Sequence, residues 1–216
     1  MKIQDRYIVI SAIACIITCI GEFICLFVFG TLYPGYNQLR DTMSSLGASD
    51  SPVSFEISLW WIIMGILIIF FGTGFKKAYR DKTRFANTAS FLIILYGFGE
   101  GICSGVFKAD HLVNGLTISA IIHDIMGGIG VTAILILPLV MLKVITRKEN
   151  PFFYEMSIIV FIFGIITILF FAFRYSPDEN NFIYFYKGLW QRLFMLNTYI
   201  YLITIAALTI KRQKKL

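Results

Sequence analysis

The sequence is poor in charged residues, in proline and in histidine. Charged residues make up 15% of the 216 positions, against about 25% in typical soluble domains, while hydrophobic residues make up 57%. The mean hydropathy is +0.76. This balance excludes an ordinary soluble globular domain and a disordered chain. There are only two histidines, so the usual three-histidine zinc site cannot be assembled from this chain alone.

Long apolar runs take up almost the whole chain. A membrane-spanning helix needs about 20 mostly apolar residues, and six such runs can be placed. They cover about residues 7–30, 57–75, 85–107, 118–144, 152–173 and 193–210. The first is too long for a signal peptide and no small-residue cleavage pattern follows it, so we expect it to be retained. The sequence therefore predicts an all-α, polytopic membrane protein that forms a single six-helix bundle over residues 1–216.

The basic residues are unevenly distributed among the connectors. Of the nineteen Lys and Arg residues, fourteen lie at the two chain ends and in the second and fourth connectors. The other five are Arg40, Lys108, Arg174, Lys187 and Arg192. By the positive-inside rule this predicts a multi-pass protein of the cell membrane with both termini in the cytoplasm. The net charge of +6 follows from this placement and does not indicate a nucleic-acid partner.

The four cysteines all lie inside the predicted spans, at Cys15, Cys19, Cys25 and Cys103. Cysteines in such runs act as small apolar side chains. We therefore expect neither a disulfide framework nor a thiolate metal site.

The first outward connector, about residues 31–56, carries two local signals. Pro34 and Gly35 predict a turn, because proline fixes φ and glycine admits positive φ. Between residues 38 and 47, apolar residues recur at helical spacing. These are Leu39, Met43 and Leu46. They predict a short amphipathic helix at the membrane interface, whose polar face presents Arg40, Asp41, Ser44 and Ser45.

Two acids lie inside predicted spans at similar depth. Glu22 and Glu100 are each about two turns from the outward end of their span. Glu100 lies beside glycines at four-residue intervals, Gly97, Gly101 and Gly105, and such stripes let helices approach closely. The acids face either a shared site or, alternatively, only a neighbouring hydroxyl or backbone group.

A further group of ionisable residues lies where the third and fourth spans meet the outward side. Asp110 and His111 lie in the connector that follows the third span. His123 and Asp124 lie near the start of the fourth span. Ionisable groups at such depth cost roughly 2.5–3.5 kcal/mol each, so they usually face a partner, a cavity or a substrate. We expect the active or binding site here, with Gln191 and Arg192 at the mouth of the sixth span beside it. A structural hydrogen bond for His123 and a snorkelling Arg192 are the alternatives.

Three ordered motifs carry a family resemblance. The stretch from Tyr33 to Ala48 resembles the first outward loop of domain-of-unknown-function family 998, six-span membrane proteins of bacteria and archaea. Gly105–Asp110 with the later His123 and Gly127, and then Gly188–Arg192, resemble its other signatures in the same order. The resemblance implies the six-span architecture and no assigned activity. It carries over Tyr33, Pro34, Gly35, Asp41, Ser44, Gly47, Asp110, His123, Gln191 and Arg192, whereas Ser45 and Lys108 depart from the family pattern.

The first functional hypothesis is an enzyme that acts on lipid-linked substrates from the outer side, as a hydrolase or transferase. Ser44 is the nucleophile, His123 is the base, and Asp110 or Asp124 orients the imidazole. Arg192 binds a phosphate or carboxylate. The remaining substrate-binding candidates are Gln191, Asp41, Tyr33, Glu22 and Glu100. In a second version His111, His123 and carboxylates hold Zn²⁺, but such sites usually have three histidines, so no cofactor is expected.

Two other classes of function are open. Glu22, Glu100, Asp110 and His123 are also the residue types that relay protons in membrane carriers, which suits a proton-coupled transport or lipid-sensing protein. The third reading is a non-catalytic accessory protein that binds a partner membrane protein or a second copy of itself. Membrane lipids are the expected partners in every case.

Overall fold

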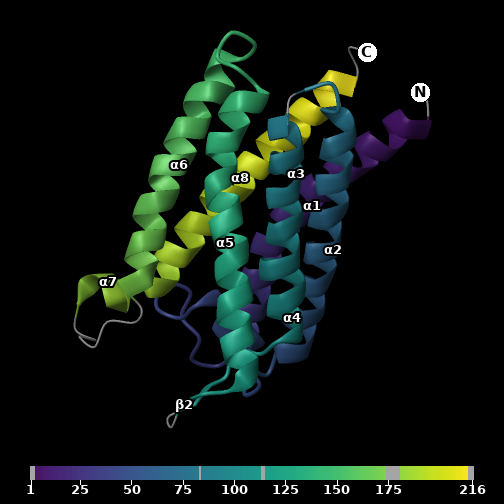
Figure 1. Ribbon diagram of the computed structural model, residues 1–216. Helices are drawn as coiled ribbons and strands as arrows, with labels where there is room; N and C mark the ends of the chain where they lie inside the picture. Colours follow the sequence, from purple (N-terminus) through teal and green to yellow (C-terminus); the bar gives the residue numbers. More distant parts are fainter. Residues whose placement is uncertain (1–2, 83, 113–114, 174–180, 214–216) are drawn as a thin grey trace.

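Long helices make up most of the computed structural model, which describes residues 3–82, 84–112, 115–173 and 181–213 (Figure 1). Within those residues, six helices are long and apolar enough to cross a membrane. They are α1 (Ile3–Leu32), α2 (Ser54–Ala78), α3 with its continuation through η2 and α4 (Arg84–Val106), α5 (Ile118–Val144), α6 (Pro151–Ala172) and α8 (Lys187–Gln213). The all-α six-span prediction is therefore confirmed. The last helix begins six residues earlier than predicted, at Lys187.

The bundle has two different ends. At one end, which we call the termini end, lie the chain termini and the connections α2–α3 and α5–α6 (Figure 1). The opposite end, the loop end, carries the shorter elements. These are the 3₁₀ helix η1 (Met43–Gly47), the antiparallel strands β1 (His111–Leu112) and β2 (Gly115–Leu116), and the short helix α7 (Phe182–Phe185). Residues 174–180, which begin the last predicted connector, lie outside the described residues.

The helix expected over residues 38–47 is shorter than predicted. The amides of Arg40 and Asp41 both donate to the carbonyl of Asn37, which makes a turn there, and only residues 43–47 are helical. Met43 and Leu46 are buried, whereas Leu39 is 46% exposed. This loop therefore inserts its apolar residues into the bundle instead of lying on the surface as an amphipathic helix. The predicted Pro34–Gly35 turn is present, and Gly35 has a φ of 83°.

Glycines set the close contacts of α3 and its continuation. A Cβ on Gly101 would lie 2.4 Å from the Cα of Gly65 on α2, so the two backbones touch there. On the other side, a Cβ on Gly99 would lie 2.3 Å from the carbonyl oxygen of Met126 on α5. The predicted stripe of Gly97, Gly101 and Gly105 thus packs the third span against α2, whereas Gly99, which lies outside that stripe, packs it against α5. Within it, residues Gly97–Cys103 form a π-helix, η2.

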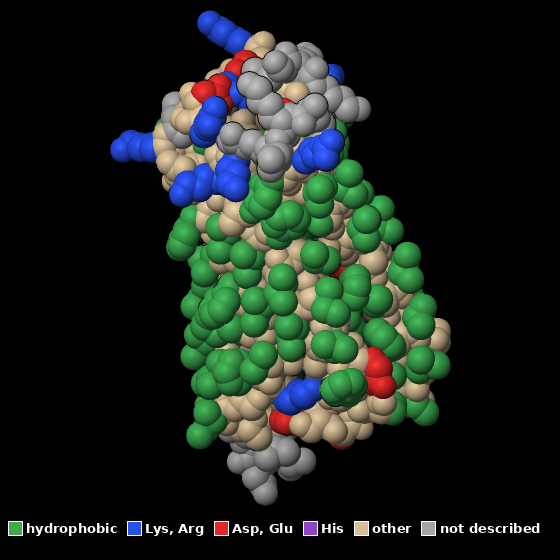
Figure 2. Space-filling model, turned by 90° about the vertical axis from the view of Figure 1, so that its right-hand side faces the viewer, with side chains coloured by type: hydrophobic (Ala, Val, Ile, Leu, Met, Phe, Trp, Pro, Cys, Tyr) green, Lys and Arg blue, Asp and Glu red, His purple; other side chains and the backbone are tan. Residues whose placement is uncertain are grey.

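The outer surface of the bundle matches a lipid environment. Figure 2 shows one face on which hydrophobic side chains form a broad band, while Lys and Arg gather at the termini end. On α1, for example, Ile10, Ile17 and Ile24 are each more than half exposed. Exposed apolar area on this scale is typical of a membrane-spanning bundle and not of a soluble protein.

Candidate functional site

A cavity of about 260 Å³ lies in the loop-end half of the bundle, where α1, α2, η2, α5, α6 and α8 meet η1. Six of the ten predicted site residues line it. They are Glu22, Ser44, Glu100, His123, Asp124 and Gln191. The structure therefore brings together residues that are up to 169 positions apart in the sequence. It does not place Tyr33, Asp41, Asp110 or Arg192 among the lining residues.

Glu22 is the most deeply buried acid of the cavity, with 1% of its surface exposed. Trp60 Nε1 donates to one carboxyl oxygen at 2.5 Å, and Trp61 Nε1 donates to the other at 3.1 Å. The two neighbouring indoles of α2 thus bind one buried carboxyl group. Because each oxygen has a donor, Glu22 can stay buried without a cationic partner.

Glu100 lines the cavity from η2. Its carboxyl group lies close to Gly127 on the facing helix α5, where a larger residue would crowd it. A Cβ on Gly127 would lie 3.1 Å from Glu100 Oε2 and 3.6 Å from Ser104 Oγ. Ser104 also lines the cavity, a residue that the sequence reasoning missed. Its position four residues after Glu100 was an available signal, because that spacing puts both on one helical face. The π-helical turn carries this acid, and such turns recur at functional sites.

His123 lies one turn before Gly127 on α5 and is 8% exposed. Its Nδ1 is 2.9 Å from the carbonyl oxygen of Phe107. A carbonyl only accepts, so Nδ1 carries the hydrogen and the neutral ring has its acceptor at Nε2. The backbone at Phe107, and not Asp110, therefore holds this nitrogen. Asp124, the next residue in the sequence, is half-buried and also lines the cavity.

Asp110 has a different place from the one predicted. Its carboxylate accepts from the amide of Ser49 at 2.8 Å and from the Ser49 hydroxyl at 2.7 Å. Nearby, Lys108 Nζ donates to Ser54 Oγ at 2.8 Å and Ser58 Oγ at 2.6 Å, at the start of α2. Burial lowers the pKa of the Lys108 ammonium group, and the charge of Asp110 opposes that shift. The two side chains attach the connection between α4 and α5 to the first loop and to α2.

Arg192 also binds the first loop. Its Nε donates to Gln38 Oε1 at 2.9 Å, and Nη1 donates to the carbonyls of Asp41 at 2.9 Å and Gly188 at 3.0 Å. Its Nη2 donates to the hydroxyl of Tyr36. Arg192 is 6% exposed, and these contacts use four of the five N–H groups of its guanidinium. We call this set of contacts the loop latch.

The remaining motif residues complete the loop latch. A Cβ on Gly188 would lie 2.4 Å from the carbonyl oxygen of Asp41, so only glycine lets the loop approach α8 there. The Asp41 carboxylate accepts from the amide of Asn37, and Tyr33 stacks on Tyr36 with ring centroids 5.8 Å apart. Burial raises the pKa of the Tyr36 phenol, although Arg192 acts in the opposite direction.

Gln191 connects the loop latch to the cavity. Its Oε1 accepts from the amide of Met43 at 2.7 Å, and both residues line the cavity. Ser44, next in the chain, lines it too, and its hydroxyl is 3.1 Å from that of Thr42. The latch therefore sets the position of the Ser44 backbone at the cavity wall.

The titratable groups of the cavity wall are mostly carboxyl groups. Among its described residues there are three carboxyl groups and one imidazole, and neither Lys nor Arg. Hydroxyl groups come from Ser44, Ser104, Thr132 and Tyr199. Among the lining residues, Gly128, Thr132 and Ala172 are exposed, and they lie on α5 and α6. The exposed part of the cavity lining therefore lies on these two neighbouring helices, and we call it the mouth.

A metal site has no further support from the geometry. In the part of the chain that the structure describes, no group of three or more His, Cys, Asp or Glu residues is arranged to hold a metal ion. The side chain of His111, a ligand in the zinc version, lies outside the described residues. The zinc version therefore remains a prediction from the sequence.

Comparison with known proteins gives one match. No curated protein and no solved structure matches the chain. One family profile, described as a protein of unknown function (DUF998), matches residues 14–208. That range holds every residue of the cavity and of the loop latch. By this match over most of its length, and with the six-span fold that the resemblance implied, the chain belongs to the DUF998 family.

Proposed function

We propose that this protein is a membrane enzyme, a hydrolase or transferase, whose amphiphilic, lipid-linked substrates enter the cavity from the bilayer. One observation carries the proposal: a cavity lined by an imidazole, three carboxyl groups and several hydroxyls has its exposed lining residues on the lipid-facing side of α5 and α6. An amphiphile would place its polar group among Glu100, His123 and Asp124. Its chain would leave between the two helices.

The lining also supports a substrate class. Apolar side chains, such as Val131, Ile168 and Phe171, line the cavity together with the acids. Because the described lining has no cation, it suits an uncharged ester, amide or hydroxyl group better than a phosphate. The predicted anion-binding role of Arg192 has no support from its contacts, which hold the first loop.

The proposed chemistry is general acid–base catalysis by His123. With Nδ1 held by Phe107, Nε2 takes a proton from water or from the hydroxyl of Ser44 or Ser104 as that oxygen attacks the substrate carbonyl. The imidazolium then returns the proton to the leaving oxygen, so protons balance over the cycle. Glu100 and Asp124 stabilise the imidazolium charge.

The loop end faces outward in this proposal. Among the described residues, the termini end carries eleven Lys and Arg against four Asp and Glu, and the positive-inside rule then places that end in the cytoplasm. A cysteine-accessibility label on Ser49→Cys that reacts from outside intact cells supports this orientation. Labelling only after permeabilisation would reverse it.

The activity is tested with purified protein and vesicles of phosphatidylcholine, phosphatidylethanolamine and phosphatidylglycerol, with products identified by mass spectrometry. His123→Gln and Glu100→Gln are expected to lower turnover at least about 100-fold. The matched control is Glu56→Gln, an exposed acid in the first turn of α2. Wild-type turnover that survives both cavity changes at normal folded yield would exclude the proposed chemistry.

The entry route is tested separately. A Cβ on Gly128 meets no atom within 4 Å, so Gly128→Phe fills the mouth without disturbing the backbone contacts. It is expected to lower the amount of co-purified lipid and the turnover together. Ile159→Phe, on a lipid-facing position that is 65% exposed, is the control and should change neither.

Proton-coupled transport is the second candidate, because Glu22, Glu100, Asp124 and His123 lie along one cavity. It predicts that wild-type proteoliposomes carry a solute-dependent proton flux that Glu100→Gln abolishes. Turnover of lipid without any such flux favours the enzyme.

A further inference from the structure

A second pocket lies at the termini end, away from the cavity. It measures about 270 Å³ and is formed by three separate chain segments. Tyr79 and Lys82 come from the α2–α3 connection, Ile145, Glu149 and Asn150 from the α5–α6 connection, and Leu208, Lys211 and Arg212 from the end of α8. Among the described residues, its lining thus holds three cations and one carboxylate, whereas the cavity at the loop end is lined by carboxyl groups and by neither Lys nor Arg.

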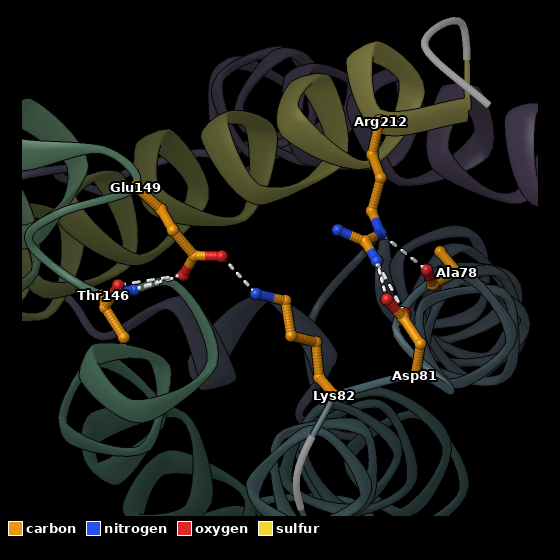
Figure 3. Close-up of polar contacts among 6 residues, drawn as sticks. All are labelled: Ala78, Asp81, Lys82, Thr146, Glu149 and Arg212. Carbon is orange, nitrogen blue, oxygen red and sulfur yellow. Dashed lines mark hydrogen bonds and ion pairs between the residues drawn. The ribbon is translucent and has the colours of Figure 1, made fainter.

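Two ion pairs form the sides of this pocket (Figure 3). Lys82 pairs with Glu149, whose other oxygen accepts from the amide of Thr146 at 2.9 Å. Opposite them, Arg212 Nη2 contacts Asp81 at 2.5 Å, and its Nε donates to the carbonyl of Ala78 at 2.9 Å. Each carboxylate is therefore held at the edge of the pocket by its own partners.

Within the described part of the chain, one terminal nitrogen of the Arg212 guanidinium donates no hydrogen bond and is available to a ligand. Figure 3 shows that the terminal nitrogen not bonded to Asp81 points toward Glu149 and Lys82, into the space between the two ion pairs. The ring of Tyr79 lies 5.0 Å from the guanidinium carbon and packs against it. Arg212 is thus fixed in orientation from three sides, while its free edge faces the pocket.

Lys211 adds a cation that no carboxylate compensates. It lines the pocket, is exposed, and makes no ion pair with a described residue. The guanidinium edge and this ammonium group together match the tetrahedral oxygens of a phosphate. Apolar Ile145 and Leu208 lie beside them, where the glycerol part of a lipid can pack.

We propose that this termini-end pocket binds an anionic phosphate group, with Arg212 and Lys211 as its ligands. Basic pockets between membrane helices on the cytoplasmic side are known to recognise phospholipid headgroups. The same chemistry would also accept a soluble phosphate ester, and the two sources are separated by experiment. The proposal does not depend on the chemistry of the loop-end cavity.

The test measures binding to the full-length protein in detergent micelles by native mass spectrometry. Short-chain phosphatidylglycerol, phosphatidylcholine of the same chain length, and inorganic phosphate are titrated in separate arms. Phosphatidylglycerol is expected to bind at least about tenfold more tightly than phosphatidylcholine, since only the latter carries its own ammonium group. Competition by inorganic phosphate assigns the site to soluble phosphates as well, whereas its failure to compete assigns the site to lipid.

Two variants make the result specific to the pocket. Lys211→Gln should weaken phosphatidylglycerol binding about fivefold or more. The control is Lys148→Gln, which removes the same charge from an exposed residue at the same end but outside the pocket. It should change phosphatidylglycerol binding less than twofold. Glu149→Gln removes the lining carboxylate and should tighten binding. Equal weakening by both lysine changes, or no binding of any probe, would overturn the proposal.

Discussion

The two ends of this bundle differ in the balance of acidic and basic residues and in the partners that hold the acids. Among the described residues, the loop-end half has seven acids and four bases, whereas the termini end has four acids and eleven bases. At the termini end, acids pair with Lys or Arg near the surface, as Asp81 does with Arg212. At the loop end, Glu22 is bound by two indoles, and Asp110 by a serine.

The charged groups of the termini end are mostly exposed to solvent, whereas several of those at the loop end are buried. An exposed ion pair contributes little to stability, about 1 kcal/mol or less. A buried acid or guanidinium needs donors or acceptors built around it, and removing one of them costs about 1–3 kcal/mol. The loop end therefore depends on its polar residues for folding, whereas at the termini end the exposed Lys211 makes no ion pair with a described residue.

The largest expected effect lies where helix backbones touch. Gly101→Leu forces a side chain into the Gly65 backbone and is expected to cost more than about 3 kcal/mol, with loss of monodisperse protein on size-exclusion chromatography. Gly128→Leu, on the open side of α5, should leave the thermal midpoint almost unchanged. Equal behaviour of the two variants would contradict the distinction between the packed helix contact at Gly101 and the open face at Gly128.

The loop latch gives the next effect. Arg192→Met leaves the carbonyls of Asp41 and Gly188 and the Gln38 side chain without their donor, at a cost of about 3 kcal/mol. We expect a lower thermal midpoint and faster proteolysis within residues 33–53. Lys187→Met, which removes a charge that packs on the Tyr184 ring, should cost under about 1 kcal/mol. An Arg192 variant with unchanged stability but no turnover would instead assign the guanidinium to the substrate.

The smallest effect concerns the paired acid at the termini end. Lys82, with the Thr146 amide, lowers the pKa of Glu149 from 4.5 to about 2. Because the folded pKa is depressed, this group's stabilisation is present above about pH 4.5 and is lost as the pH falls toward 2. Lys82→Met should raise the pKa, as measured by carbon NMR of the Glu149 carboxyl group. Since Glu149 is 45% exposed on its side chain, the stability change should stay below about 1 kcal/mol.

The spans could be predicted because apolar run length alone determines them. The cavity could be predicted in part for a related reason. Glu22 and Glu100 were placed at the same depth from residue counts, and a helix rises a constant distance per residue. His123 and Gly127 were placed on one face by the same geometry. All of these residues indeed meet at one cavity.

The connections between loops could not be predicted in the same way. Nothing in the spacing of residues 33–48 says that their carbonyls turn toward Arg192, some 150 positions away. The sequence therefore suggested substrate binding for Arg192 and Asp41 and a catalytic role for Asp110. The structure places all three in contacts that hold the loop. Trp60 and Trp61 were missed for a similar reason, because an indole suits both the interface and a buried acceptor.

The proposed entry of substrate from the bilayer, through the mouth formed by Gly128, Thr132 and Ala172, would have a practical consequence. A compartment that exchanges with the hydrocarbon phase fills according to the mole fraction of its occupant in that phase, not its molarity in water. Any surfactant chosen to extract the protein is then a competitor. Inhibitors of this chain would be ranked correctly only after correction for how strongly each one partitions into the membrane.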